Sequence, residues 1–205
     1  MIHNKVQRLT IAAIFIAIII IQVFVPYVGY FRIIPGLPAI TTLPLTLAIA
    51  GSLLGPGFGF SLGLFWGILS MILAYTQPSS MVTLVLFQNP LIAIVPRAVA
   101  GAVAGFIGTL AKNKDKTKQT IFYILAGSLG ALINTILVIT LSSLIFMMHP
   151  QTLLNALGQA HNNGTLIWIL LVALGANGIA EAIFAGIFTP IIVLPLKKIM
   201  TRRIH

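Results

Sequence analysis

Long apolar runs that carry almost no charge constrain this chain more than any other feature of its sequence. The run at 9–25, for example, reads LTIAAIFIAIIIIQVFV. Over the whole chain 59% of the 205 residues are hydrophobic and 7% are charged, whereas soluble domains average roughly 25% charged residues. A chain of this size cannot hide so much apolar surface from water, so its solvent must be lipid. The sequence therefore predicts an all-α integral membrane protein, with residues 1–205 forming one domain.

Ten of the twelve Lys and Arg residues fall in three clusters, and these clusters set the expected orientation. Lys5 and Arg8 open the chain, four lysines occur in KNKDKTK at 112–118, and four basic residues lie between Lys197 and Arg203. The positive-inside rule places such clusters in the cytoplasm. Both termini are therefore expected there, and each stretch between two clusters is expected to cross the membrane an even number of times.

The lengths of the apolar runs and the turn residues between them predict a bundle of six transmembrane helices. The expected spans are roughly 9–25, 41–54, 58–75, Pro96 to Lys112, 120–147 and 165–189. The second span is short for a hydrocarbon core of about 30 Å. Its outer end is therefore expected to be irregular backbone, which is tolerated at that depth only against protein or a water-filled cavity. This is a first indication of a cavity on the outer side.

Arg97 and Arg32 are the two basic residues that map to the outer side, against the charge rule. Pro96 suits the first position of a helix because its missing N–H would be unpaired there, which would put Arg97 in the first turn. Free backbone N–H groups and the positive end of the helix dipole converge at that place. Together with a guanidinium they predict a site for an anion, most simply a carboxylate. The alternative is an interfacial arginine whose side chain snorkels to lipid headgroups.

Four neutral polar residues are candidates to complete a substrate-binding site with Arg97. Gln88 and Asn89 precede it on the same outer stretch, Asn134 lies midway along the fifth predicted span, and Asn177 lies in the sixth. Their amide groups donate and accept hydrogen bonds without adding charge. The combination is suited to a small anionic molecule that also carries neutral polar groups.

Glu181 is the one acidic residue in any predicted span, and an intramembrane carboxyl group is a functional hypothesis by default. It lies four residues after Asn177, on the same helix face. At about 1.5 Å per residue it lies ~24 Å from the start of the sixth span. That depth is large for a ligand contact in an outer pocket, so we expect Glu181 to be a structural group bonded inside the bundle.

The patterns of the common enzyme classes are missing from the sequence. Cysteine is absent, which excludes disulfides and thiolate metal sites, and the four histidines are scattered without metal-ligand spacing. There is no GxxxxGK[ST] phosphate loop and no Ser/His/Asp or paired-carboxylate arrangement. We therefore predict no enzymatic activity, no cofactor and no metal site. The formal net charge of +10 is expected to face the anionic inner leaflet rather than nucleic acid.

Three segments together resemble the substrate-binding S components of energy-coupling factor (ECF) vitamin transporters. They are the first outer loop VPYVGYFRIIPGLPAITTLPLTLA, the turn and helix LLGPGFGFSLGLFWG, and IVPRAVAGAVAG. Within this family the loop ending in ITTLP, the LFQNP stretch and NGIAEAIFAGI look most like the pantothenate-type members. The likeness extends over nearly the whole chain.

The resemblance implies a multi-pass protein of the bacterial cell membrane that binds one water-soluble vitamin from outside, under its first and third outer loops. It also implies a transmembrane T subunit and two ATPase subunits as partners that drive delivery inwards. In that family small residues spaced at four on the first helix contact the T subunit, and Ala13 and Ala17 fit this pattern. The same spacing of glycines in the third and fourth spans is attributed to packing within the bundle.

The residue types leave the identity of the vitamin open. Pantothenate carries one carboxylate, hydroxyls and an amide, which suits Arg97 combined with the four neutral side chains. Folate also carries carboxylates and would want more aromatic stacking surface, and cobalamin is far larger. Two other classes of function also stay open: a stand-alone secondary transporter, which would need no ATPase, and a membrane scaffold without a ligand.

Overall fold

The computed structural model describes residues 5–25, 27–31, 40–78, 80–158 and 165–202. This part of the chain forms eight helices and one antiparallel two-stranded hairpin. The helices are α1 (Lys5–Phe24), α2 (Leu43–Leu54), α3 (Pro56–Thr76), α4 (Met81–Phe87), α5 (Pro90–Leu110), α6 (Lys116–Ile145), α7 (Pro150–Ala156) and α8 (Leu166–Arg202). The strands are β1 (Tyr30–Phe31) and β2 (Ile40–Thr41).

Five of these helices, α1, α3, α5, α6 and α8, are long and apolar enough to cross a membrane. The predicted all-α membrane fold is therefore confirmed. Helix α2 is apolar but has only 12 residues, and most of its side chains are buried. The turn between α2 and α3 depends on Gly55, whose φ of 100° is a conformation that other residues rarely adopt. Pro56 then begins α3 at the position where a missing N–H costs nothing.

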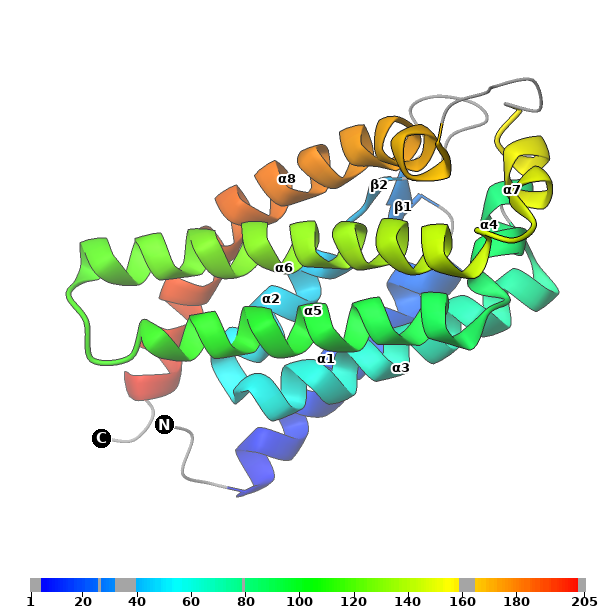
Figure 1. The fold of residues 1–205 in the computed structure, drawn as a ribbon. Helices are drawn as coiled ribbons and strands as arrows, with labels where there is room; N and C mark the ends of the chain where they lie inside the picture. The colour runs from blue at the N-terminus through cyan, green and yellow to red at the C-terminus, as the bar shows by residue number, and fades with distance from the viewer. Residues whose placement is uncertain (1–4, 26, 32–39, 79, 159–164, 203–205) are drawn as a thin grey trace.

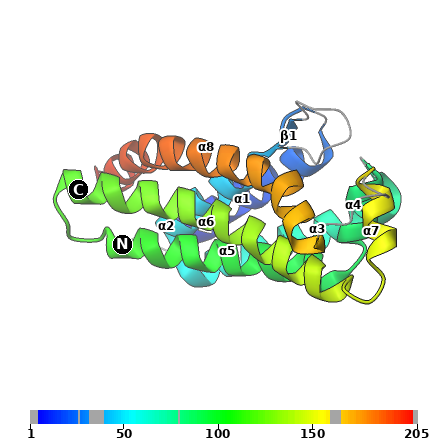
Figure 2. The same cartoon turned by 45° about the horizontal axis from the view of Figure 1, so that its top comes forward.

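The helices α3, α5, α6 and α8 pack side by side in that order (Figures 1 and 2). The short helix α2 contacts all four of them, and α1 packs on α2 and α3. Glycines allow the closest approach, because a Cβ on Gly101 of α5 would lie 2.1 Å from the carbonyl oxygen of Gly59 in α3. A Cβ on Gly59 would in turn lie 2.2 Å from the carbonyl oxygen of Gly101. The predicted role of these regularly spaced glycines in bundle packing is confirmed.

The two ends of the molecule are built differently. The start of α1, the end of α8 and the α5–α6 turn lie at one end, whereas the hairpin, α4 and α7 lie at the other (Figure 1). The first end carries the basic residues: Arg8 donates to the carbonyl oxygen of Leu54 at 3.5 Å, and Lys197 donates to the hydroxyl of Tyr123. The basic clusters therefore gather at a single end of the bundle, as the charge pattern requires.

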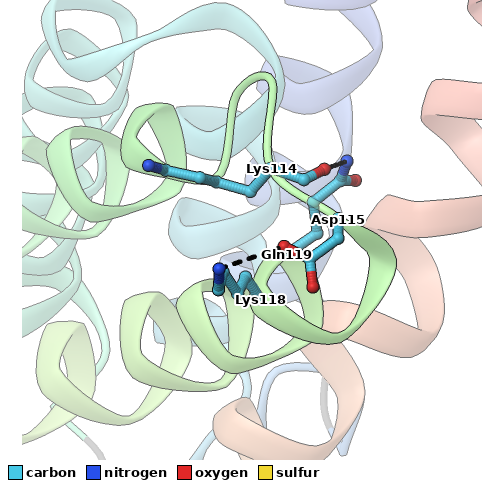
Figure 3. A network of polar contacts seen from close by, with 4 residues as sticks. All are labelled: Lys114, Asp115, Lys118 and Gln119. Atoms are coloured by element: carbon cyan, nitrogen blue, oxygen red, sulfur yellow. Dashed lines mark hydrogen bonds and ion pairs between the residues drawn. The ribbon is translucent and has the colours of Figure 1, made fainter.

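The α5–α6 turn at this end is held by contacts within the turn itself (Figure 3). Gln119 Nε2 donates to the carbonyl oxygen of Lys114 at 2.7 Å, and Lys118 Nζ lies 3.6 Å from a carboxylate oxygen of Asp115. Asn113 adopts a positive φ of 60° in the same turn, a conformation that Asn tolerates better than most residues. The lysine-rich sequence thus forms a compact exposed turn between two spans.

The structure corrects the predicted start of the fourth span. Asn89 caps α5 because its Oδ1 accepts a hydrogen bond from the Leu91 N–H at 3.0 Å, and Pro90 takes the first helical position. Pro96 therefore lies inside the helix rather than at its start. The prediction that Arg97 lies in the first turn, among free backbone N–H groups, is wrong.

Two short helices at the hairpin end lie between the predicted spans. Helix α4 begins after Ser80, whose hydroxyl accepts a hydrogen bond from the Thr83 N–H at 3.1 Å, and α7 packs against α4. Arg32, the second outer basic residue, lies outside the described residues. So do Pro26, Pro35, Gly36 and Pro38 of the first outer loop.

Candidate functional site

A cavity of about 430 Å³ lies at the hairpin end of the bundle. Its walls come from the end of α1, the hairpin, α3, α4, α5, α6 and α8. Its polar lining residues are Tyr27, Tyr30, Thr41, Ser70, Gln77, Thr83, Arg97, Asn134, Thr135, Asn177 and Glu181. Small-molecule pockets typically measure about 300–1,000 Å³ and are mostly apolar with a few convergent polar groups. The cavity therefore has the size and the lining of a site for a small water-soluble molecule.

Arg97 is the only basic side chain in the described lining of this cavity. It is 4% exposed, so the alternative of an arginine that snorkels to lipid headgroups is wrong. Its guanidinium carbon lies 4.2 Å from the ring centre of Phe87 and 5.3 Å from that of Trp66. Among the described residues its Nε has no hydrogen-bond partner and no carboxylate forms an ion pair with it. The cavity wall thus presents a buried cation with unused donor capacity, which an anion would stabilise.

Pro96 explains how Arg97 is held toward the cavity. In a regular helix the carbonyl of Ile92 would accept the N–H of residue 96, but proline has no N–H to donate. The Nη1 of Arg97 donates to this carbonyl instead, at 2.6 Å. Side-chain bonds of this kind are how membrane helices satisfy backbone groups that proline leaves free. The Pro-Arg pair therefore fixes the guanidinium by a local bond rather than by a helix terminus.

The hairpin closes one side of the cavity through bonds to two different helices. Tyr30 on β1 and Thr41 on β2 are paired in the hairpin register. The Trp66 Nε1 of α3 donates to the Tyr30 hydroxyl at 3.1 Å, and the Thr41 N–H donates to Glu181 Oε1 of α8 at 2.7 Å. Burial raises the pKa of Tyr30, so its hydroxyl stays neutral and keeps a proton to donate.

The structure brings some of the predicted site residues to the cavity and leaves others away from it. Arg97, Asn134 and Asn177 line it, and the buried Asn134 Oδ1 has no hydrogen-bond partner in the described part of the chain. Gln88 and Asn89 are not lining residues. The Gln88 carbonyl accepts the Tyr75 hydroxyl at 3.2 Å, and the Asn89 side chain caps α5. Gln88 and Asn89 therefore make these bonds at the junction between α4 and α5, outside the cavity lining.

Glu181 also lines the cavity, which the depth argument from the sequence did not predict. The cavity descends between α6 and α8 as far as this residue, and Leu174 and Gly178 of α8 line it as well. The expected bond inside the bundle is present too, because Glu181 accepts from Thr41. Glu181 is therefore both a structural group and part of the cavity wall.

The covering segments differ in part from those that the family resemblance implied. The first outer loop contributes Tyr27, Tyr30 and Thr41, as expected. The segment between α3 and α5 contributes Gln77, Thr83 and Phe87. None of the described residues of the third outer loop, 146–158 and 165, lines the cavity, and helix α7 within it packs against α4.

The cavity offers groups for binding rather than for covalent chemistry. Its described polar groups are one guanidinium, one carboxyl, amides and hydroxyls, with no arrangement of a nucleophile beside a general base. No cluster of three or more His, Cys, Asp or Glu side chains occurs within the described ranges of the chain. Such a lining can select a ligand by charge, hydrogen bonding and shape.

Ala13 and Ala17, the predicted partner-binding residues, lie on an exposed face of α1. The buried residues of this helix are Phe15, Ile19 and Val23. Two positions along a helix correspond to a rotation of about 200°, so the alanines lie nearly opposite the stripe that packs into the bundle. Packing within this chain therefore does not account for their spacing.

Comparison with known proteins decides the family. A family model described as "ECF transporter, substrate-specific component" matches residues 7–193. The chain belongs to the family of ECF-transporter substrate-specific (S) components. It is accordingly a transporter subunit and not an enzyme, and as an S component with several apolar spans it is a multi-pass protein of the bacterial cell membrane.

Two relatives of this S component match over most of their length. A protein named "Pantothenate transporter PanT" from Leuconostoc mesenteroides subsp. mesenteroides is 37% identical over 148 residues, which cover 70% of this chain and 72% of the relative. A protein named "Pantothenic acid transporter PanT" from Lactococcus lactis subsp. cremoris is 31% identical over 213 aligned positions, covering 95% of this chain and 96% of the relative. The resemblance to S components drawn from the sequence motifs is confirmed.

Proposed function

We propose that this S component binds pantothenate in the cavity and that Arg97 holds the pantothenate carboxylate. The observation that carries the proposal is the buried guanidinium between Trp66 and Phe87, whose Nε has no partner among the described residues. Asn134 and Asn177 line the same cavity and supply neutral groups for the hydroxyls and the amide of the vitamin. The names of both relatives support this choice of ligand.

The size and the lining of the cavity disfavour cobalamin and folate as ligands. A volume of about 430 Å³ suits a small molecule and is too small for cobalamin. Folate needs flat aromatic faces on which its ring system can stack, but here the Arg97 guanidinium lies against the faces of Trp66 and Phe87. A small vitamin with a single carboxylate makes better use of these groups.

The test of the proposed function is equilibrium binding of labelled pantothenate to the purified protein in detergent or nanodiscs. We expect saturable binding of one pantothenate per chain that excess folate does not displace. Binding of folate in place of pantothenate, or no binding of either, would overturn the proposal. Pantothenate uptake into vesicles that contain this chain alone would instead favour a stand-alone secondary transporter.

We further propose six membrane crossings, with α2 as the sixth, and both termini in the cytoplasm. The gathering of the basic residues at one end of the bundle supports this orientation. The cavity then faces the outside.

Family membership supports an ECF T subunit and two ATPase subunits as partners, and we propose the exposed alanines Ala13 and Ala17 of α1 as the contact with the T subunit. Nothing in this function requires nucleic acid, a metal or a cofactor.

The role of Pro96 as a positioning residue gives a prediction for pantothenate affinity. In Pro96→Ala the new backbone N–H can donate to the Ile92 carbonyl and displace the Arg97 side chain from it. One hydrogen bond contributes about 1 kcal/mol, so we expect pantothenate binding to weaken by about three- to tenfold. Titration calorimetry on the purified variant measures the change.

Pro90→Ala provides the matched control for this prediction. Pro90 lies in the same helix at its first position, where no N–H is needed. We expect this variant to bind pantothenate as the unmodified protein does. An unchanged affinity in Pro96→Ala as well would show that the proline does not position Arg97.

A further inference from the structure

Glu181 presents a carboxyl group to the cavity, in addition to the guanidinium of Arg97. It is 5% exposed and lines the cavity from α8. Its Oε1 accepts the Thr41 N–H at 2.7 Å. A carboxyl group has two oxygens, and each can take part in more than one hydrogen bond. The bond to the hairpin therefore leaves most of the hydrogen-bonding capacity of this group to a molecule in the cavity.

Glu181 and Arg97 reach the cavity from two different helices, α8 and α5. Helix α6 lies between α5 and α8 (Figures 1 and 2) and contributes Asn134 to the cavity. The described lining therefore runs from a guanidinium on α5, across an amide on α6, to a carboxyl on α8. A ligand with a carboxylate at one end and hydrogen-bond donors at the other matches both walls.

On this basis, which rests on the proposed function, we propose that Glu181 determines specificity by accepting hydrogen bonds from ligand hydroxyl groups. The hydroxyls of pantothenate lie in the half of the molecule away from its carboxylate, so Arg97 and Glu181 bind opposite ends. A site built around a buried hydrogen-bonding group rejects analogues that lack the matching group, because the buried group is then left unpaired.

The experiment measures four affinities, those of two proteins for two ligands, and compares them as a double-mutant cycle. The unmodified protein and Glu181→Gln are each titrated with pantothenate and with the analogue in which both hydroxyls are replaced by hydrogen. Glutamine keeps an oxygen that accepts the Thr41 N–H, so the hairpin bond survives. We expect the substitution to weaken pantothenate binding by about ten- to hundredfold. We expect it to change the affinity for the dideoxy analogue less than about threefold, because this analogue has no hydroxyls to donate to Glu181.

Thr189→Val is the matched control on the same helix. Thr189 is fully buried and donates only to the Ala185 carbonyl of α8, at 2.6 Å, away from the cavity lining. This nearly isosteric change should leave both affinities unaltered.

Equal losses for both ligands in Glu181→Gln would show that Glu181 acts only through the hairpin, and would overturn the inference. If the variant does not fold, the unmodified protein decides: equal affinity for pantothenate and the dideoxy analogue overturns the inference, and a weaker analogue supports it. Absence of pantothenate binding by the unmodified protein would overturn the proposed function and this inference together. If the unmodified protein binds pantothenate, but Glu181→Gln changes the affinities for pantothenate and for the dideoxy analogue equally, this inference fails and the proposed function stands.

Discussion

Replacing Arg97 by alanine is expected to weaken pantothenate binding by about a hundredfold or more. Removing one partner of a buried, hydrogen-bonded charge pair typically costs about 2–5 kcal/mol, and each 1.4 kcal/mol corresponds to a factor of ten in affinity. Arg97 is the one cation in the described lining of the cavity, so no neighbour there can take over its role. Titration calorimetry with purified protein measures the loss.

Removing the charge of Arg97 is expected to leave the protein without ligand at least as stable as the unmodified protein. Without a ligand, Arg97 is a buried charge with an unused Nε in the described structure, and such a group lowers the free energy of unfolding. Arg97→Met keeps much of the side-chain volume and removes the charge. We expect its thermal midpoint without ligand to equal or exceed that of the unmodified protein. A binding defect caused by misfolding would lower this midpoint instead.

The ligand itself supplies the control for Arg97. Pantothenol, in which an alcohol replaces the carboxylate, should bind the unmodified protein much more weakly than pantothenate does. It should bind Arg97→Ala about as well as it binds the unmodified protein. If pantothenate and pantothenol lose the same affinity in Arg97→Ala, the guanidinium does not bind the carboxylate.

The membrane fold follows from the sequence because lipid imposes simple rules. Every backbone polar group in a span must be satisfied locally, so apolar runs become helices and their ends lie near charges and turn residues. Such runs predict α1, α3 and α6 to within a few residues, and the Gly55-Pro56-Gly57 turn predicts the boundary between α2 and α3. Pro96 misled the prediction for α5, since proline inside a membrane helix is tolerated when a side chain takes over the free carbonyl.

The candidate site was partly predictable, because buried charge in a membrane protein is rare. Arg97 stands out by this criterion, as does Asn134 in the middle of an apolar helix. Glu181 stands out equally, but its placement depends on how deep the cavity reaches between α6 and α8. Sequence distance from a helix start does not contain that information. The contributions of Trp66 and Phe87 were likewise hidden, since aromatic residues in spans are common.

Replacing both Ala13 and Ala17 by leucine is expected to abolish vitamin uptake with the ECF partner subunits while leaving pantothenate binding intact. Both residues are exposed on α1, nearly opposite its buried residues Phe15, Ile19 and Val23. Small residues spaced at four let helices approach closely in lipid, and leucine would hold a partner helix away. In the isolated subunit leucine merely faces lipid, so the bundle and its cavity are unchanged. Binding is measured on the purified chain, and uptake in vesicles that contain the T subunit and the ATPases.

Ala176→Leu separates docking from a general effect of added bulk. Ala176 is exposed on α8, which belongs to a different wall of the bundle. The substitution therefore adds the same leucine side chain to another lipid-facing surface. This control should transport normally. Uptake by the Ala13→Leu/Ala17→Leu variant at the rate of the unmodified protein would exclude this face of α1 as the contact with the T subunit. Loss of binding together with uptake would place the defect in the bundle itself. Loss of uptake alone therefore identifies α1 as the docking helix, because the cavity at the opposite end of the molecule still functions.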